Sequence, residues 1–269
     1  MYDLYNEAQT PFEWHKALFE RAHTLGVQIF STPFDETAAD LLEDLNVPAF
    51  KIASFELTDL PLIKYIAKKQ KPLIISTGLG NLDEIGSAVN AAKSMGNNDI
   101  ILLHCVSSYP APVEQSNVRT VKHLAETFDV VTGLSDHTSS NSASIASIAT
   151  GGSVIEKHFT LLRADGGPDS NFSLEPDEFT KLTRECREAW ASLGKVDYSV
   201  KAAERPNLKF RRSIYFVRDL EIGSVISKND VKVIRPGFGL PPVEIENVVG
   251  KKLSIKVSRG TPTKWEQFN

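Results

Sequence analysis

Short apolar runs alternate with segments of helical periodicity over the first two thirds of the chain. Each unit has a β-rich run, a turn rich in Ser, Thr, Asp or Gly, and a stretch whose apolar positions recur every three or four residues. The runs predict six strands, at 26–32, 49–54, 72–77, 99–105, 130–135 and 154–159. Helical periodicity predicts helices at 10–26, 35–46, 81–96, 118–128 and 175–194.

Strands that alternate with helices at this spacing form either an open doubly wound sheet or a (β/α)8 barrel. Almost every predicted strand ends in polar residues, among them Ser31 with Thr32, Ser76 with Thr77, and Asp136 with His137. Polar groups that converge from six successive strands are typical of the catalytic rim of a barrel rather than of a single crevice. We therefore expect a TIM barrel.

The number of strands does not match a closed barrel, which needs eight. The chain supplies six before its last long helix, and the stretch 10–26 is the helix that leads into the first of them. We expect a (β/α)8-type barrel that lacks its first two βα units. Its open edges would expose parallel strands.

Beyond about residue 195 the pattern of apolar residues changes and predicts short strands broken by Gly and Pro. We predict a partial barrel over 1–195, a charged linker over 196–208 and a small β-rich domain over 209–269. Residues 201–269 hold 14 Lys and Arg against 7 Asp and Glu, whereas residues 1–200 hold 16 against 27. The basic residues are dispersed among apolar ones, so the pattern favours an acidic small substrate or partner domain over nucleic acid.

Composition places the chain among globular proteins, since 41% of its residues are apolar and 24% are charged. No apolar run is long enough for a transmembrane helix, and the first residues lack the features of a signal peptide. We expect a cytoplasmic protein without membrane contact. The two cysteines, Cys105 and Cys186, are too few for a disulfide framework and are expected to be reduced and structural.

Two histidines follow adjacent predicted strands, His137 in GLSDHT and His158 in EKHFT. Both side chains are expected at one point above the barrel mouth, where two imidazoles suit a divalent metal with open positions for water and substrate. A general base and simple loop contacts remain open as alternatives. The other histidines are expected to be structural: His15, His23, His104 and His123.

Lys51 lies inside an apolar strand, AFKIAS, where a buried ammonium needs an anionic partner. The partner is either a phosphate or carboxylate ligand, or a neighbouring carboxylate such as Glu56 or Glu156. Hydroxyls at four strand ends would complete an anion cradle, although each alone could be a helix cap: Thr32, Ser54, Ser76 and Ser135.

The loop DGGPDSNFSLEP holds Asp169 in a turn after the last predicted strand, close to His158. Asp169 is expected to orient a substrate hydroxyl, to bind metal or to cap the following helix. Weaker candidates, each with a surface role as the alternative, are Glu56, Tyr109 and Arg235.

These motifs together resemble the sialic acid synthase family, and within it the pseudaminic acid synthases. The matching segments occur in family order over nearly the whole chain: STPF (31–34), KIAS (51–54), STG (76–78), YPAP (109–112), GLSDHT (133–138), EKHFT (156–160), GGPDS (166–170) and RPGFGLPP (235–242). FELTDLPLI (55–63) and GGPDSNFSLEP are similar to the pseudaminic branch.

The resemblance implies a barrel followed by an antifreeze-like (SAF) domain, in a domain-swapped homodimer where each small domain reaches the partner's barrel. It implies that His137 and His158 bind Mn²⁺ or Mg²⁺. It further implies that phosphoenolpyruvate is bound by Lys51, Thr32, Ser54, Ser76 and Ser135, and that the amino sugar faces Glu56, Tyr109, Asp169 and the partner's Arg235. Ser107 replaces an asparagine of the neuraminate enzymes, so a contact to phosphoenolpyruvate is expected to differ.

The implied reaction condenses phosphoenolpyruvate with 2,4-diacetamido-2,4,6-trideoxy-altrose to a nine-carbon 2-keto acid, with release of phosphate. An N-acetylneuraminate or legionaminate synthase is the alternative within the family. Family members carry two further βα units with a catalytic glutamate and a second lysine. A truncated, inactive remnant that dimerises or binds ligand is therefore a hypothesis of another class, and a class II aldolase is a third.

Overall fold

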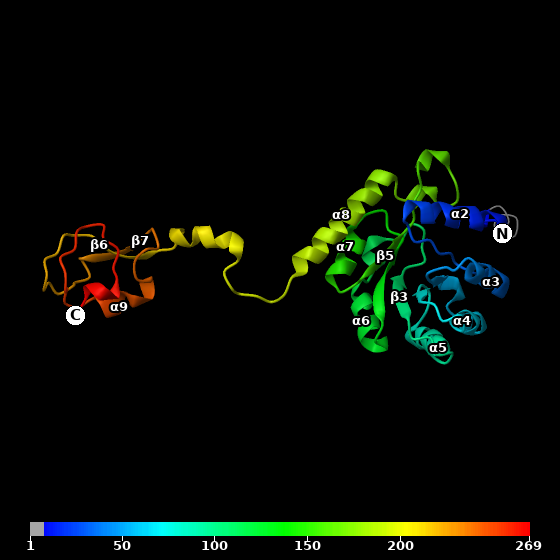
Figure 1. Cartoon of the computed structure of the whole chain (residues 1–269), viewed down its shortest axis with the longest axis horizontal. Coiled ribbons are helices and arrows are strands. Elements are labelled where there is room, and N and C mark those ends of the chain that lie inside the picture. Colours follow the sequence, from blue (N-terminus) through cyan, green and yellow to red (C-terminus); the bar gives the residue numbers. More distant parts are fainter. Residues whose placement is uncertain (1–7) are drawn as a thin grey trace. The chain divides into compact units, whose positions relative to one another are not determined.

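A computed structural model describes residues 8–269 of the chain. The chain divides between Gly194 and Lys195 into two compact units, which are considered separately. The two units are coloured blue to yellow-green and yellow to red along the sequence in Figure 1. The described residues contain no helix that is both long and apolar enough to cross a lipid bilayer.

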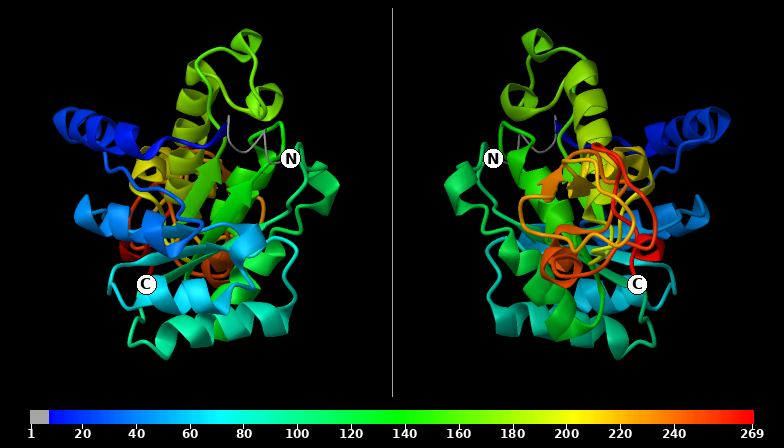
Figure 2. Two further views of the ribbon diagram at one scale, coloured as in Figure 1. Left: turned by 90° about the vertical axis from the view of Figure 1, so that its right-hand side faces the viewer. Right: turned by 90° about the vertical axis from the view of Figure 1, so that its left-hand side faces the viewer.

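The first unit is built on a sheet of five parallel strands in sequential order. The strands are β1 (Phe50–Ile52), β2 (Leu73–Ser76), β3 (Ile100–Cys105), β4 (Val131–Asp136) and β5 (Val154–Lys157). Sequential parallel order requires a crossover between each pair of strands, and helices supply it. Figure 2 shows the green strands of this unit running side by side with helices outside them.

Five helices form where the apolar periodicity predicts them: α2 (Phe12–Leu25), α3 (Glu36–Asp44), α5 (Leu82–Lys93), α6 (Arg119–Phe128) and α8 (Pro176–Leu193). Two further helices, α4 (Leu60–Ala67) and α7 (Ser142–Ala149), were not predicted. Short 3₁₀ turns lie at η1 (Ser54–Glu56), η2 (Val113–Gln115), η3 (Arg163–Asp165) and η4 (Ser170–Phe172). Local chemistry sets several ends: Asn81 and Glu84 form a capping box at α5, and Gly26 ends α2 in the left-handed conformation.

The two faces of the sheet have different neighbours. Phe50, Ile52 and Leu102 point toward the helices and join the main apolar core with residues of α3, α4, α5 and α6. The alternate residues Ile74 and Leu103 pack on the opposite face, in a small cluster with Ala49. Helices therefore cover one face of the curved sheet and leave the other as the inside of a barrel wall, as expected for a partial (β/α)8 barrel (Figure 1).

The strand predicted over 26–32 is wrong, because the structure has no strand before β1 among the described residues. A single backbone hydrogen bond joins this segment to β1, from Lys51 N to Ser31 O at 3.4 Å. Val27 and Phe30 are 58% and 41% exposed. A β-rich run becomes a strand only when a neighbour accepts its hydrogen bonds, and β1 offers just three paired residues.

The second unit is small and β-rich. Strand β6 (Ser213–Phe216) pairs antiparallel with β7 (Val231–Ile234), and an isolated bridge joins Tyr215 of β6 to Pro262. The other elements are short: η5 (Ala202–Phe210), η6 (Pro242–Glu244), α9 (Ile245–Val248) and η7 (Trp265–Gln267). Its core is separate from that of the first unit and includes Ile214, Phe216, Ile226, Val248 and Leu253.

Candidate active site at the carboxyl ends of the strands

The motifs GLSDHT and EKHFT lie at the carboxyl ends of the neighbouring strands β4 and β5. Ser135 is opposite Glu156 and Asp136 is opposite Lys157 in the parallel register. His137 and His158 follow at the ends of these strands, and their ring centroids lie 5.2 Å apart. The structure therefore brings together the two histidines that the sequence predicts to share one site.

His137 is 6% exposed and is held from several sides. Its Nδ1 lies 3.0 Å from the Val106 carbonyl oxygen and 3.8 Å from Cys105 Sγ, and its own carbonyl accepts a hydrogen bond from Ala111 N. Burial opposes the charged imidazole, but the contacts with Cys105 and Val106 outweigh it and raise the pKa of His137. The ring is thus fixed through Nδ1, and Nε2 remains for a ligand.

His158 is more open, with 31% of its side chain exposed. Its Nδ1 lies 3.5 Å from Asp169 Oδ2, so the predicted proximity of this aspartate is present. Burial, and then the neighbouring His137, lower the pKa of His158. Tyr109 packs against both rings, with centroids 4.3 Å from His137 and 6.0 Å from His158, and Phe172 closes the cluster from η4.

Lys51 lies on the inner face of β1 and is 6% exposed. Its Nζ donates to Ser76 Oγ at 2.7 Å and lies 3.5 Å from Glu156 Oε2. Ser135 Oγ donates to the other carboxylate oxygen of Glu156 at 2.6 Å. Glu156 therefore links Lys51 on β1 to Ser135 on β4, and the carboxylate partner considered from the sequence is the one that the structure shows.

Ser54, Ser107 and Cys105 surround Gly78, just beyond β2. Ser54 Oγ accepts a hydrogen bond from Gly78 N at 3.1 Å. A Cβ at Gly78 would collide with Ser107 Oγ and would lie 2.7 Å from Ser54 Oγ. Burial would raise the pKa of the Cys105 thiol, but hydrogen bonding with His137 and Ser54 more than offsets it and lowers that pKa. The glycine thus leaves room for a polar cradle.

The remaining predicted residues lie apart from this cluster or make no contact with it. Glu56 lies in η1, where burial raises the pKa of its carboxyl, and its Oε2 has no hydrogen-bond partner among the described residues. Thr32 lines a separate cavity of about 170 Å³ between α2 and α3. Arg235 is exposed in the second unit, directly after β7.

Sequence reasoning missed two members of the cluster, Gly78 and Cys105, and named Glu156 only as one of two carboxylates that could pair with Lys51. Side-chain alternation favours Glu156, because it stands two residues before His158 on the same strand. Cys105, expected to be structural, lies beside His137, although both cysteines are free as predicted. No local pattern marks Gly78, because only the folded structure shows what its missing side chain would meet.

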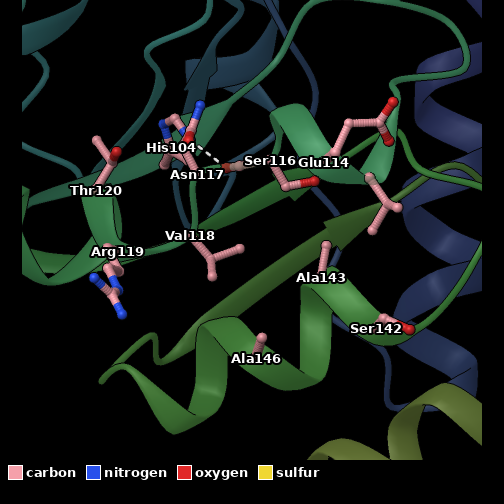
Figure 3. A pocket seen from close by; sticks show the side chains of 11 residues that line it. His104, Glu114, Ser116, Asn117, Val118, Arg119, Thr120, Ser142, Ala143 and Ala146 are labelled. Carbon is pink, nitrogen blue, oxygen red and sulfur yellow. Dashed lines mark hydrogen bonds between the residues drawn. The ribbon is translucent and has the colours of Figure 1, made fainter.

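A larger cleft lies elsewhere, on the helical side of the sheet. It has a volume of about 810 Å³ and is bordered by η2 and the first turns of α6 and α7 (Figure 3). His104 lies at this cleft, and its Nε2 is 2.8 Å from the Ser116 carbonyl oxygen. Because His104 alternates with Leu103 and Cys105 on β3, it points away from the histidine pair. The size of this cleft is therefore no argument for placing the chemistry there.

The histidine pair is also where the structure offers ligands to a metal ion. Each ring uses Nδ1 toward a carbonyl or carboxylate, and neither Nε2 has a hydrogen bond within residues 8–269. Metal-binding histidines have this arrangement, in which an outer partner fixes the ring. The described residues contain no group of three or more His, Cys, Asp or Glu side chains suited to a metal. A metal here would keep several positions for water and substrate oxygens.

Comparison with known proteins gives matches over both units. Residues 1–198 match the NeuB family and residues 211–269 match the SAF domain. The chain is 39% identical to the pseudaminic acid synthase of Helicobacter pylori, covering 97% of this chain and 77% of that protein. It is 38% identical to the N,N'-diacetyllegionaminic acid synthase of Legionella pneumophila, covering 99% and 76%.

A solved structure supports the same relationship. The crystal structure of the N-acetylneuraminic acid synthetase of Leptospira borgpetersenii, in complex with citrate, superposes with a TM-score of 0.72 at 31% identity. That match covers 78% of this chain and 73% of the other. The chain therefore belongs to the NeuB family of sialic and related nonulosonic acid synthases, with a SAF domain at its carboxyl end.

Proposed function

We propose that the protein is a pseudaminic acid synthase, which condenses phosphoenolpyruvate with 2,4-diacetamido-2,4,6-trideoxy-altrose. The observation that carries this proposal is the meeting of Lys51, Glu156 and the His137–His158 pair on one face of the sheet, at the carboxyl ends of its strands. The identity to pseudaminic acid synthases supports the choice of branch. Legionaminate and N-acetylneuraminate synthases are the competitors within the family.

Lys51 and the hydroxyls around it suit an anionic substrate. The buried Lys51 ammonium donates to the Ser76 hydroxyl at 2.7 Å and to the Ile52 carbonyl oxygen at 3.2 Å, and the Glu156 carboxylate lies at 3.5 Å. A phosphate or carboxylate oxygen would bind by taking the place of this more distant carboxylate. Ser54 and Ser107 offer further hydroxyls beside the space left by Gly78. We assign this half of the site to phosphoenolpyruvate, with Ser76 and Ser135 at its edge. Thr32 belongs to the same assignment, although no contact joins it to the cluster in the part of the chain described.

His137 and His158 fit a divalent ion such as Mn²⁺ or Mg²⁺, because each ring is fixed through Nδ1 and keeps Nε2. Such an ion, when bound, would polarise the sugar aldehyde as a Lewis acid. The contribution of the protein is orientation: Val106 and Asp169 hold the two imidazoles, and Tyr109 packs across both.

The amino sugar is assigned to the outer part of the site. Tyr109 is 46% exposed and Asp169 is exposed, so both can meet a ligand that enters from solvent. Glu56 offers a buried carboxylate oxygen with no partner among the described residues. We further propose that Arg235 of a second copy completes this part of the site in a domain-swapped homodimer.

In the proposed reaction, C3 of phosphoenolpyruvate attacks the aldehyde carbon of the open-chain sugar and forms the new C–C bond. Water adds to the cationic C2, and the tetrahedral adduct loses phosphate to give the 2-keto acid. Lys51 stabilises negative charge on the phosphoenolpyruvate oxygens throughout, which is an electrostatic contribution from a preorganised, buried group. The proton lost by the attacking water ends on the former aldehyde oxygen, which becomes a hydroxyl, and the proton lost when the adduct collapses ends on the phosphate.

The decisive experiment supplies the full chain with Mn²⁺, phosphoenolpyruvate and one sugar at a time. We expect phosphate release coupled to a nine-carbon keto acid, identified by mass, with the altrose derivative as the best substrate by kcat/KM. A higher kcat/KM for N-acetylmannosamine would overturn the choice of branch. Product formation from pyruvate without phosphate would show aldolase chemistry instead.

Shared sites are testable by mixing two inactive variants, His137→Ala and Arg235→Ala. If each site combines one barrel with the arginine of the other chain, mixed dimers regain one working site, and about a quarter of all sites become active. Activity that stays at zero after unfolding and refolding the two variants together would exclude a shared site. Mixing His137→Ala with itself serves as the control.

A further inference from the structure

A buried ion pair, Asp136 with Lys157, lies between the Ser135–Glu156 pair and the His137–His158 pair along β4 and β5. Lys157 Nζ lies 3.0 Å from Asp136 Oδ2, and each side chain is 1% exposed. These residues are directly opposite one another at the ends of β4 and β5, and each immediately precedes a histidine of the candidate site. The described residues contain no other ion pair with both side chains buried to this degree.

The pair lies on the face opposite the histidines. Ser144 of α7 donates to Asp136 Oδ2 at 2.6 Å, so the carboxylate faces the helices. The residue pairs before and after it lie on the barrel side, where Ser135 contacts Glu156 and His137 lies beside His158. The ion pair therefore faces the helices and cannot touch a substrate bound on the barrel side. It can affect the positions of the two histidines only through the backbone of β4 and β5.

Both charges also hold the loop that follows His137. Thr138 N donates to Asp136 Oδ1 at 2.8 Å, and Lys157 Nζ donates to the carbonyl oxygens of Thr138 and Ser140. The chain is thus fixed on both sides of His137, by Asp136 before it and by the Thr138 backbone after it. Lys157 directly precedes His158, so its bonds connect this fixed segment to the end of β5.

We infer that the Asp136–Lys157 pair positions His137 and His158 at the spacing that a shared metal ion requires. A slip of one residue between β4 and β5 would turn the histidines to different faces, and it would also separate two buried charges. Apolar residues at these positions would pack equally well in shifted registers, whereas the ion pair is satisfied in only one. Both are positioning residues that act through the strand ends, and this role rests on the proposed function of the histidine pair.

The test compares Lys157→Met with Lys69→Met in the full chain. Lys69 is a matched control, because its side chain is 8% exposed and it also bridges two carboxylates, Asp40 and Glu43 of α3. Lys69 precedes β2, so it lies at the amino ends of the strands and not at the carboxyl ends that carry the candidate site. Binding of Mn²⁺ alone is measured by electron paramagnetic resonance, below the unfolding temperature of each variant. We expect affinity about 10- to 100-fold weaker in Lys157→Met, the usual loss for an outer-shell partner, and unchanged affinity in Lys69→Met.

A second readout does not depend on metal. In protein labelled at histidine, the nuclear Overhauser effect between the two rings reports their separation, which is 5.2 Å between centroids in the structure. We expect it to be lost in Lys157→Met and kept in Lys69→Met and in Lys157→Arg, which retains a cation opposite Asp136. If Lys157→Met does not fold, Asp136→Asn, which keeps the volume, is measured in the same way.

The outcomes separate the two proposals. Wild-type affinity and an unchanged ring contact in folded Lys157→Met would overturn the positioning role. Absence of Mn²⁺ binding in the wild type would overturn the metal assignment instead, and the ring contact alone would then decide the role of the ion pair. A loss of stability with both readouts intact would show that the pair only stabilises the fold.

Discussion

The inner and outer faces of the same five-stranded sheet differ in what their residues do. Inner positions of β1, β4 and β5 carry Lys51, Ser135 and Glu156, which bond to one another. Outer positions of β1 and β2 carry Phe50, Ile52, Leu73 and Ile75, all fully buried against helices. Strand alternation thus places chemistry and packing one residue apart along the chain.

This separation means that function and stability can be changed independently in most of the sheet. The exception is the last rung of β4 and β5, where the buried charges Asp136 and Lys157 stand on the outer face and the histidines follow on the inner side. There, the residue that holds the fold and the residue that performs chemistry are neighbours in sequence. Substitutions on either face test how far the separation holds.

The largest effect is expected on the inner face, from His137→Ala. Loss of one of two imidazoles should lower kcat/KM for phosphate release by at least about 100-fold, since even outer partners of metal ligands are worth 10- to 100-fold. Phosphate release is measured at saturating Mn²⁺. His123→Ala, on the exposed face of α6, is the control and should keep wild-type activity. Equal activity in both variants would refute the assignment of the histidine pair.

A large effect on stability, without one on chemistry, is expected on the outer face from Leu102→Ala. Leu102 is fully buried in the main core, so the cavity should lower the free energy of unfolding by about 2–5 kcal/mol. Urea unfolding gives this value, and kcat/KM per folded molecule should stay unchanged. Val131→Ala, 50% exposed in the neighbouring strand, should cost less than about 1 kcal/mol. A fall in kcat/KM for folded Leu102→Ala would break the separation of the faces.

Two glycine-to-alanine substitutions, one on each side of the sheet, are expected to change stability by intermediate amounts and in opposite directions. Gly78→Ala places a methyl group into Ser54 and Ser107, so it should cost about 1–3 kcal/mol and weaken phosphoenolpyruvate binding. Gly86→Ala in α5 meets only Phe128 at 3.6 Å and should stabilise the helix by about 0.5–1 kcal/mol. Thermal unfolding with and without phosphoenolpyruvate measures both. The prediction fails if the two alanines shift the unfolding temperature in the same direction.

The smallest effect is expected from Glu178, which lies outside both faces. Its hydrogen bonds with Arg163 and the Glu175 backbone lower the pKa of its carboxyl to about 2, below the usual 4.5 of a glutamate. A lowered pKa in the folded state stabilises the protein above pH 4.5, and this stabilisation is lost as the pH falls toward 2. Glu178→Gln should therefore cost less than about 1 kcal/mol at pH 7, because the pair is exposed, and nothing near pH 2. Urea unfolding at both pH values measures the difference, and a cost that does not fall with pH would contradict it.

Much of the fold was predictable from local patterns. The strands β1 to β5 and helices such as α5 and α8 follow from apolar periodicity and end signals, which depend on neighbours in sequence. The segment 26–32 has the same composition and forms no strand, because strand formation also needs a paired neighbour. The pairing of Lys51 with Glu156, 105 positions later, was only one of several open alternatives for the same reason.

The amino-acid sequence by itself determined the alternation of strands and helices, the polar strand ends and the candidates Lys51, His137 and His158, since motif spacing and periodicity are properties of the chain. Only the tertiary structure decided which of these groups touch. It placed Glu156 between Lys51 and Ser135, put Cys105 beside His137, and set a buried ion pair directly behind the two histidines. Contacts across strands depend on register and on which face each residue takes, and both are settled only when the whole sheet has packed.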